Sequence, residues 1–264
     1  MKNKDIYVIG DIHGSYIPID NFYRRNKRRL NKDSVMIILG DSGCLYYLDN
    51  RDNFFKQKLG NYNLTYFMIR GNHEERASVC AKNNPTKWHK EVFFGNKVYV
   101  ENDFPYIKYA LDEPALYQIN EYKTLIIPGA YSVDKYYRLK KGWAWFEDEQ
   151  LSPEEMDTGR RIVQENKDSI DLVLSHTCPI MYEPRDLFLS QVNQSTVDKT
   201  MEMYLGELEY QLNYNYKLWM WGHFHAYRPY YNNKILKNLM IYNEKAVNLE
   251  ECINTGLSRT IKTY

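Results

Sequence analysis

The sequence lacks an excess of charge of either sign. Its 35 basic residues stand against 34 acidic ones, which gives a formal net charge of +1 over 264 residues. A molecule with so small a net charge has no global field that attracts nucleic acid or an anionic membrane. Any preference for an anionic ligand must therefore come from a local group of cations.

Long apolar runs and paired cysteines are also missing. No stretch approaches the ~20 consecutive apolar residues that a membrane-spanning helix requires. The four cysteines lie far apart and form no C-x-x-C pair, and Met1–Asp5 leads into the first expected strand without an apolar signal segment. We therefore expect a soluble cytoplasmic protein with reduced thiols and no membrane partner.

No low-complexity tract, internal repeat or Pro/Gly-rich linker divides the chain, so we expect one domain over residues 1–264, with an insertion around 131–150. Short aliphatic or β-branched runs alternate with helix-compatible segments. Strands are expected at 5–10, 34–40, 64–70, 105–110, 115–120, 122–128, 171–175 and 217–221, and helices at 15–30, 48–60, 74–83, 153–167 and about 196–212. This pattern predicts an α/β architecture with helices outside a β-rich centre.

Polar clusters follow the expected strands, where ligands of open α/β sheets collect. Carboxylate, imidazole and amide oxygen are donors suited to Mn²⁺, Fe or Zn²⁺. Each cluster alone is more often a polar turn, a helix cap or a structural histidine, but five of the six histidines occur in these clusters, and together they predict a metal site. The clusters are Asp11-Ile12-His13-Gly14, Gly40-Asp41, Gly71-Asn72-His73-Glu74, His176 and Gly222-His223-Phe224-His225.

The spacing within the clusters suggests individual roles. In an extended segment, alternate residues such as Asp11 and His13 point to one side, so both can reach one ion. Asp41 at a strand end could bridge two metal ions roughly 3.5–4 Å apart, a distance at which they can hold both oxygens of a phosphate displacement. His73, beside Asn72 but unable to reach the same ion, is free to act as a general acid.

In this order the motifs resemble the calcineurin-like metallophosphoesterase superfamily, over residues of about 5 to 227. The resemblance implies a four-layer α/β fold, a β-sandwich flanked by helices with a di-metal centre at one rim. It also implies two divalent transition-metal ions per chain, with Mn²⁺ favoured and Fe or Zn²⁺ as alternatives. By this resemblance Asp11, His13, Asp41 and His225 hold the first metal, and Asp41, Asn72, His176 and His223 hold the second.

The same resemblance makes His73 the group that protonates the leaving oxygen or steadies the transition state, with Glu74 orienting His73 or a ligand. Within the superfamily, Gly10–Gly14 and Arg70–Glu74 are closest to the protein serine/threonine phosphatase branch. That branch continues Gly-Asp with Asp-Arg-Gly, whereas Ser42, Gly43 and Cys44 stand here, so its phosphate-gripping arginine is missing. The Gly-His-x-His ending resembles the phosphodiesterase members instead.

What replaces this arginine is left open by the sequence. Arg70, Lys135 and Arg138 are the candidate substrate contacts, and the last two lie in a segment that could equally be a solvated loop. Trp143, Trp145 and Phe146 could stack a nucleobase, but we assign them to the core beneath the insertion.

The sequence therefore predicts a metal-dependent phosphoesterase that hydrolyses small-molecule or nucleotide phosphomonoesters or diesters by attack of a metal-bridging hydroxide. A protein serine/threonine phosphatase is the alternative, and a non-catalytic interaction scaffold is a third, disfavoured because every ligand position is intact. The expected partner is a phosphorylated small molecule or nucleotide, and the net charge does not indicate nucleic acid. The natural substrate, the preference between monoesters and diesters, the metal in the cell and the oligomeric state stay open.

Overall fold

Buried aliphatic runs form two sheets at the centre of the molecule. The computed structural model describes residues 4–188 and 193–255. Within these residues the first sheet has seven strands in the order β13-β1-β2-β3-β6-β5-β4. They are β1 (Ile6–Ile9), β2 (Val35–Leu39), β3 (Thr65–Ile69), β4 (Trp88–Phe93), β5 (Asn96–Glu101), β6 (Ile107–Tyr109) and β13 (Val247–Asn248).

The second sheet, counted over the same described residues, has six strands in the order β11-β12-β10-β9-β8-β7. They are β7 (Ala115–Ile119), β8 (Tyr122–Ile127), β9 (Leu172–Ser175), β10 (Leu218–Trp221), β11 (Arg228–Asn232) and β12 (Ile235–Met240). Strands β1, β2, β3 and β6 run parallel to one another, as do β8, β9, β10 and β12. The carboxyl ends of parallel neighbours lie at one edge of their sheet, so the loops that follow them are brought together.

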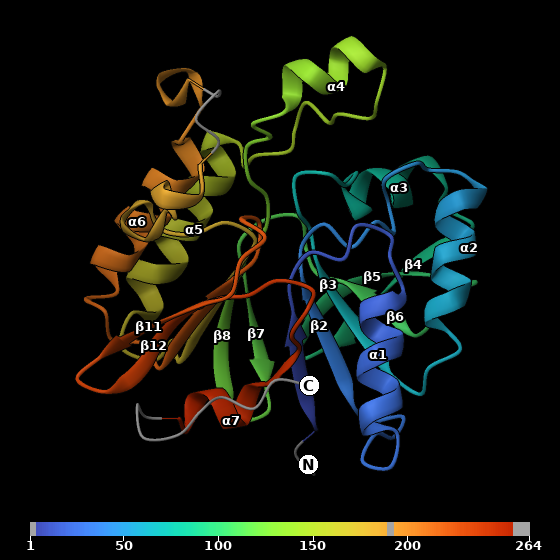
Figure 1. Cartoon of the computed structure of the whole chain (residues 1–264), viewed down its shortest axis with the longest axis horizontal. Coiled ribbons are helices and arrows are strands. Elements are labelled where there is room, and N and C mark those ends of the chain that lie inside the picture. The colour runs from blue at the N-terminus through green and yellow to red at the C-terminus, as the bar shows by residue number, and fades with distance from the viewer. Residues whose placement is uncertain (1–3, 189–192, 256–264) are drawn as a thin grey trace.

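Helices cover the outer face of each sheet, as Figure 1 shows. Helices α1 (Ile17–Asn26), α2 (Asn50–Leu59) and α3 (Ala77–Asn83) lie beside the first sheet, and α5 (Pro153–Asn166) and α6 (Thr200–Gln211) beside the second. The short helices α4 (Lys135–Lys141) and α7 (Leu249–Ile253) belong to neither layer. No helix in the described part of the chain is both long and apolar enough to cross a lipid bilayer.

Three clusters of buried side chains correspond to the interfaces between these layers. Alternate strand residues such as Ile37 and Met220 meet between the two sheets. The opposite faces pack against the helices, Ile38 with Phe22 of α1 on one side and Val173 with Leu205 of α6 on the other. Helices, sheet, sheet and helices thus form four layers, and the fold predicted from the sequence is confirmed.

Every strand and helix expected from the sequence is present, although the helices are shorter than expected. Helix α5 begins as its sequence indicates, because the Ser152 side chain accepts from the N–H of Glu155 and Pro153 occupies the first turn. The β4–β5 and β11–β12 hairpins and helix α4 were not predicted. Strands β4 and β11 are mostly exposed or partly buried, and α4 has no buried residue, so these segments carry no clear apolar period.

Candidate metal centre

The loops after β1, β2, β3, β9 and β10 meet at the carboxyl edge of the parallel strands. Together they bring close to one another all the side chains predicted from the sequence as metal ligands, which are Asp11, His13, Asp41, Asn72, His176, His223 and His225. The two sheets each contribute, the first with its three N-terminal loops and the second with the loops after β9 and β10.

One group of donor atoms lies toward the solvent. The Nε2 atoms of His13 and His225 are 2.9 Å apart, and His225 Nε2 is 3.4 Å from Asp11 Oδ2. The donor atoms of these three residues all lie within 4.8 Å of one another. The carboxylate is buried, whereas both imidazoles are exposed at the opening of the site.

A second group lies deeper. Asn72 Oδ1 is 2.8 Å from His176 Nε2 and 3.1 Å from His223 Nδ1, and Asp41 Oδ1 is 3.7 Å from His176 Nε2. The other oxygen of Asp41 is 4.0 Å from His13 Nδ1. The Asp41 carboxylate therefore stands between the two groups of donors.

The hydrogen bonds around the deeper group leave its lone pairs pointing at one another. His176 Nδ1 donates to the carbonyl of Leu39 at 2.7 Å, so its Nε2 carries no proton. Asn72 Nδ2 donates to Ser132 Oγ at 2.8 Å, which turns Oδ1 toward the same Nε2. Two buried acceptors 2.8 Å apart are stable only with a cation or a proton between them. The donors present therefore fit a divalent metal ion of the hard-to-borderline class.

The protonation states of three imidazoles suit this interpretation, whereas at His225 burial is outweighed by the hydrogen bond and charge of Asp11, which raise its pKa. Burial lowers the pKa of His13 to about 4 and that of His223 to about 3, and it also lowers the pKa of His176. Neutral imidazole is the form that binds a metal ion. Burial raises the pKa of Asp11, but hydrogen bonding from His225 and the neighbouring imidazoles outweigh it and bring the value to about 2. Burial, together with the charges of Asp11 and Glu74, raises the pKa of Asp41.

The local backbone differs from the extended segments expected from the sequence. His13, Asp41, His223 and His225 all have positive φ, between 45° and 66°. The prediction that alternation along a strand places Asp11 beside His13, and His223 beside His225, is therefore wrong in its reason. These residues converge because tight turns follow the strands, and such strained positions are common at functional sites.

Glycines make room for the buried carboxylates and imidazole. A Cβ atom at Gly71 would overlap Asp41 Oδ1, and one at Gly222 would overlap Asp11 Oδ1. At Gly40 a Cβ would overlap the His176 ring. The glycine that precedes each of these motifs is thus required by the packing around the donors.

His73 lies beside the donors. Its backbone N–H donates to Asp41 Oδ1 at 2.9 Å, and its ring Nε2 is 3.8 Å from Asp41 Oδ2. Burial and then the charge of Arg138 lower the pKa of His73 to about 2, so its ring is neutral. Glu74 accepts from the Ser42 hydroxyl and from the N–H groups of Gly43 and Gly71 at 3.0 and 3.2 Å, and so ties the loop after β2 to the loop after β3.

Of the three candidate substrate contacts, Arg138 is the one that reaches the site. Its Nη2 is 3.4 Å from His73 Nε2, and its Nη1 donates to the Tyr46 hydroxyl at 3.0 Å. The Nζ atom of Lys135 lies 4.0 Å from the centroid of the Trp145 ring instead. Arg70 is buried, and its Nη1 donates to the carbonyl of Glu149 at 2.8 Å, so it connects loops behind the site.

The assignment of the insertion's aromatic residues to the core is wrong for Trp143, which is 51% exposed. Helix α4 contributes no buried residue, so there is no core beneath the insertion for this indole to fill. Trp145 and Phe146 are partly buried, and Trp145 Nε1 donates to Glu149. Sequence reasoning also missed Ser132 and Tyr46, because their contacts join segments far apart in the chain and leave no local pattern.

Two cavities flank the donors and share Asp41 and His73. The first, of about 200 Å³, is lined by His13, Gly14, Gly43, Tyr46, Tyr47, Arg138 and Trp143 in addition to the shared pair. The second, of about 330 Å³, is lined by residues that include Asn72, Asp134, Glu183, Phe188, Glu202, Phe224 and His225. The metal-binding side chains therefore stand between two spaces.

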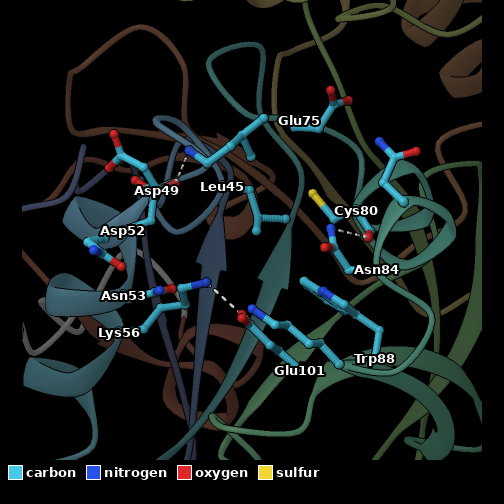
Figure 2. A pocket seen from close by; sticks show the side chains of 14 residues that line it. Leu45, Asp49, Asp52, Asn53, Lys56, Glu75, Cys80, Asn84, Trp88 and Glu101 are labelled. Carbon is cyan, nitrogen blue, oxygen red and sulfur yellow. Dashed lines mark hydrogen bonds and ion pairs between the residues drawn. The ribbon is translucent and has the colours of Figure 1, made fainter.

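A third cavity, of about 290 Å³, lies between α2, α3 and the β4–β5 hairpin (Figure 2) and contains none of the predicted site residues. Its floor includes an ion pair of Lys56 and Glu101 at 2.5 Å. Asp52 also lines this cavity, and its carboxylate accepts from the N–H groups of Tyr47 and Leu48 at 2.9 and 2.7 Å. This carboxylate thereby fixes the loop that carries Tyr46 and Tyr47 into the first cavity.

Comparisons with known proteins give the family and the fold of the chain. The family model of the calcineurin-like phosphoesterases matches residues 4–227. No curated protein sequence matches the chain. The solved structure of TT1561 of Thermus thermophilus is 12% identical, with a TM-score of 0.54, over 100% of this chain and 99% of that one. The structure of the phosphopantetheinyl hydrolase PptH of Mycobacterium tuberculosis is also 12% identical, with a TM-score of 0.48, over 92% and 90%. The likeness to TT1561 is a likeness of fold alone.

The glycine packing predicts a loss of metal without any change of ligand. Gly222→Ala should lower the metal content of the purified protein, because the new methyl group must displace the Asp11 carboxylate. Gly206→Ala is the control. Gly206 lies on helix α6, away from the donors, and its new Cβ would meet Ile180 Cγ2 at 3.1 Å. Elemental analysis that found equal metal content in both variants would contradict this role of Gly222.

A second prediction concerns Glu202, a buried carboxyl that lines the larger cavity. Burial raises its pKa to about 7, while the Thr177 hydroxyl donates to it at 2.6 Å. Because the folded protein holds this proton more tightly than the unfolded chain, stability falls as pH rises from about 4.5 to about 7. Glu202→Gln should therefore gain stability relative to the native protein at pH 8 but not at pH 5, by a difference on the order of 3 kcal/mol. Thermal unfolding at the two pH values measures it, and an equal shift of Tm at both would exclude this titration.

Proposed function

The chain belongs to the calcineurin-like phosphoesterase family, and we propose that it hydrolyses esters of small-molecule or nucleotide phosphates. The observation that carries the proposal is that the Arg138 guanidinium lies at the same opening as the converging metal donors, 3.4 Å from His73. Divalent ions bound to these donors would supply Lewis-acid polarisation of a phosphoryl oxygen. The chain's own side chains would bind the phosphate and supply a proton to the leaving oxygen.

Arg138 is the group that grips the phosphate in this proposal. Its guanidinium lines the smaller cavity, and its Nε is held by Asp134 Oδ2 at 2.8 Å, which fixes the direction of the Nη atoms. A guanidinium fork presents two parallel donors to a phosphate. It would thus compensate for the arginine that the Ser42-Gly43-Cys44 sequence does not supply.

His73 is the group beside the leaving oxygen. In the protein without substrate, burial and the charge of Arg138 keep its ring neutral. A phosphate anion bound to Arg138 offsets that charge and raises the pKa of His73, since an opposite charge nearby favours the protonated form. His73 could then give a proton to the leaving oxygen, while the Asp41 and Asp134 oxygens at 3.8 and 3.9 Å stabilise the imidazolium.

The two cavities favour a substrate with two groups on phosphorus. A phosphomonoester places an organic group on one side of the phosphate, whereas a diester or a phosphoanhydride carries groups on both. Because both cavities include Asp41 and His73, each side of a phosphate held there would find space. We therefore propose that diesters or nucleotide phosphoanhydrides are hydrolysed alongside monoesters.

Activity that depends on metal and on His73 tests the proposal. We expect hydrolysis of p-nitrophenyl phosphate and an alkyl phosphate by protein loaded with Mn²⁺, and none after chelation. His73→Ala should keep the metal content and lower kcat for the alkyl ester by roughly 10²–10⁴-fold, the usual effect of losing a general acid. The loss should be smaller for the nitrophenyl ester, whose leaving group needs little protonation. Equal losses on both esters would contradict proton donation.

Substituting Arg138 tests the phosphate contact. A dianionic monoester gains more from a nearby cation than a monoanionic diester does, so Arg138→Ala should lower kcat/KM for p-nitrophenyl phosphate more than for bis-p-nitrophenyl phosphate. Loss of a charged hydrogen bond of about 1.5–3 kcal/mol corresponds to roughly 10- to 150-fold. Lys135→Ala is the matched control on the same helix, because Lys135 lies over Trp145. A comparable loss in that variant would contradict the assignment to Arg138.

A further inference from the structure

Helix α4 and the turn after it leave large side chains in contact with solvent. No residue of α4 is buried, and Tyr136, Tyr137, Leu139 and Trp143 are each at least half exposed. Figure 1 shows the helix standing clear of the two helical layers. A group of exposed aromatic side chains beside a functional site indicates a surface that binds a ligand.

The exposed group is continuous with the smaller cavity. Trp143 lines this cavity together with Tyr46, Tyr47 and Arg138. Tyr137 meets Trp143 edge-to-face with ring centroids 5.5 Å apart, so it covers at most one face of the indole. Tyr46 and Tyr47 of the same lining are also edge-to-face, with centroids 4.6 Å apart. The Trp143 cavity, as we call it, is thus lined by aromatic rings and by the candidate metal donors His13 and Asp41.

Cations surround these rings. Between Asp134 and Glu147 the chain carries no acidic residue, and its basic residues there are Lys135, Arg138, Lys140 and Lys141. Lys141 Nζ lies 5.6 Å from the centroid of Tyr137. The Arg51 guanidinium lies 3.6 Å from that of Tyr47, although it is paired with Asp49 at 2.7 Å. In a chain with a net charge of +1, this is a local concentration of positive charge. Its chemistry complements a ligand that is both aromatic and anionic.

The volume of the Trp143 cavity limits the size of the group that it can bind. At about 200 Å³ it is smaller than the roughly 300–1,000 Å³ of pockets that enclose whole small ligands. It therefore suits one planar ring system while the phosphate lies on Arg138 and the metal donors. An aliphatic group would gain little from the surrounding rings, whereas a nucleobase has a π-face that stacks on them.

We propose that the Trp143 cavity binds the nucleobase of a nucleotide substrate, with the base stacked on the Trp143 indole and facing Tyr46 and Tyr47. This inference rests on the proposed phosphoesterase function and names its substrate class. Asp52 acts as a positioning residue for the same cavity, since it holds the backbone of Tyr47 and Leu48.

The test compares adenosine 5′-monophosphate with glycerol phosphate, a monoester without a base, in protein loaded with Mn²⁺. Trp143→Ala should lower kcat/KM for the nucleotide by roughly 5- to 150-fold, the loss expected from one base–aromatic stack, mainly through KM. Trp143→Phe should retain most of the activity, and glycerol phosphate should be hydrolysed at an unchanged rate in both variants. Phe54→Ala, which removes an exposed ring on α2, is the control and should leave both substrates unaffected.

Binding is measured separately, so that loss of this inference can be told from loss of the proposed function. Adenosine should quench tryptophan fluorescence in the metal-loaded native protein and not in Trp143→Phe. If no ester is hydrolysed but the quenching is seen, the phosphoesterase proposal fails and the base-binding cavity stands. Equal losses on the nucleotide and on glycerol phosphate in Trp143→Ala would overturn the inference. So would binding of α4 to phosphatidylserine vesicles that needs Trp143, with nucleotide hydrolysis unchanged.

Discussion

Crowded acceptor atoms at the carboxyl edge of the parallel strands are the constraint on which the rest of the structure depends. Asn72 Oδ1 and His176 Nε2 lie 2.8 Å apart in a buried position, and the Asp41 carboxylate is next to them. Buried lone pairs without a donor are costly. A cation held there would convert this cost into a favourable interaction.

Much of the surrounding structure serves to keep these acceptors in place. The carbonyl of Leu39, in a buried strand, fixes the tautomer of His176, and Ser132 fixes the amide of Asn72. Glu74 connects the loop that carries Asp41 to the loop that carries His73. These contacts hold the donors in position before a metal ion binds.

The insertion around residues 131–150 adds a cation and an exposed aromatic ring beside the metal donors. Helix α4 has no core of its own, but Arg138 extends from it to His73 and Tyr46, and Trp143 follows at the border of the same cavity. The chain as a whole is almost neutral, and its cations near the site are local. In the proposed function, recognition of an anion is therefore a property of this one segment rather than of the general electrostatic field.

The sequence by itself determined the layered fold and indicated the candidate metal donors, because both follow from local order along the chain. Continuous apolar runs form buried strands, and the polar residues after Ile9, Leu39, Ile69, Ser175 and Trp221 must then lie at one edge of parallel sheets. Local order could not show that left-handed turns orient His13 and His223, since their φ depends on the close packing of neighbouring loops. Local order also could not show that Arg138 rather than Lys135 lies beside His73, or that Trp143 is exposed to solvent. Those outcomes depend on contacts between distant segments, and only the tertiary structure decided them.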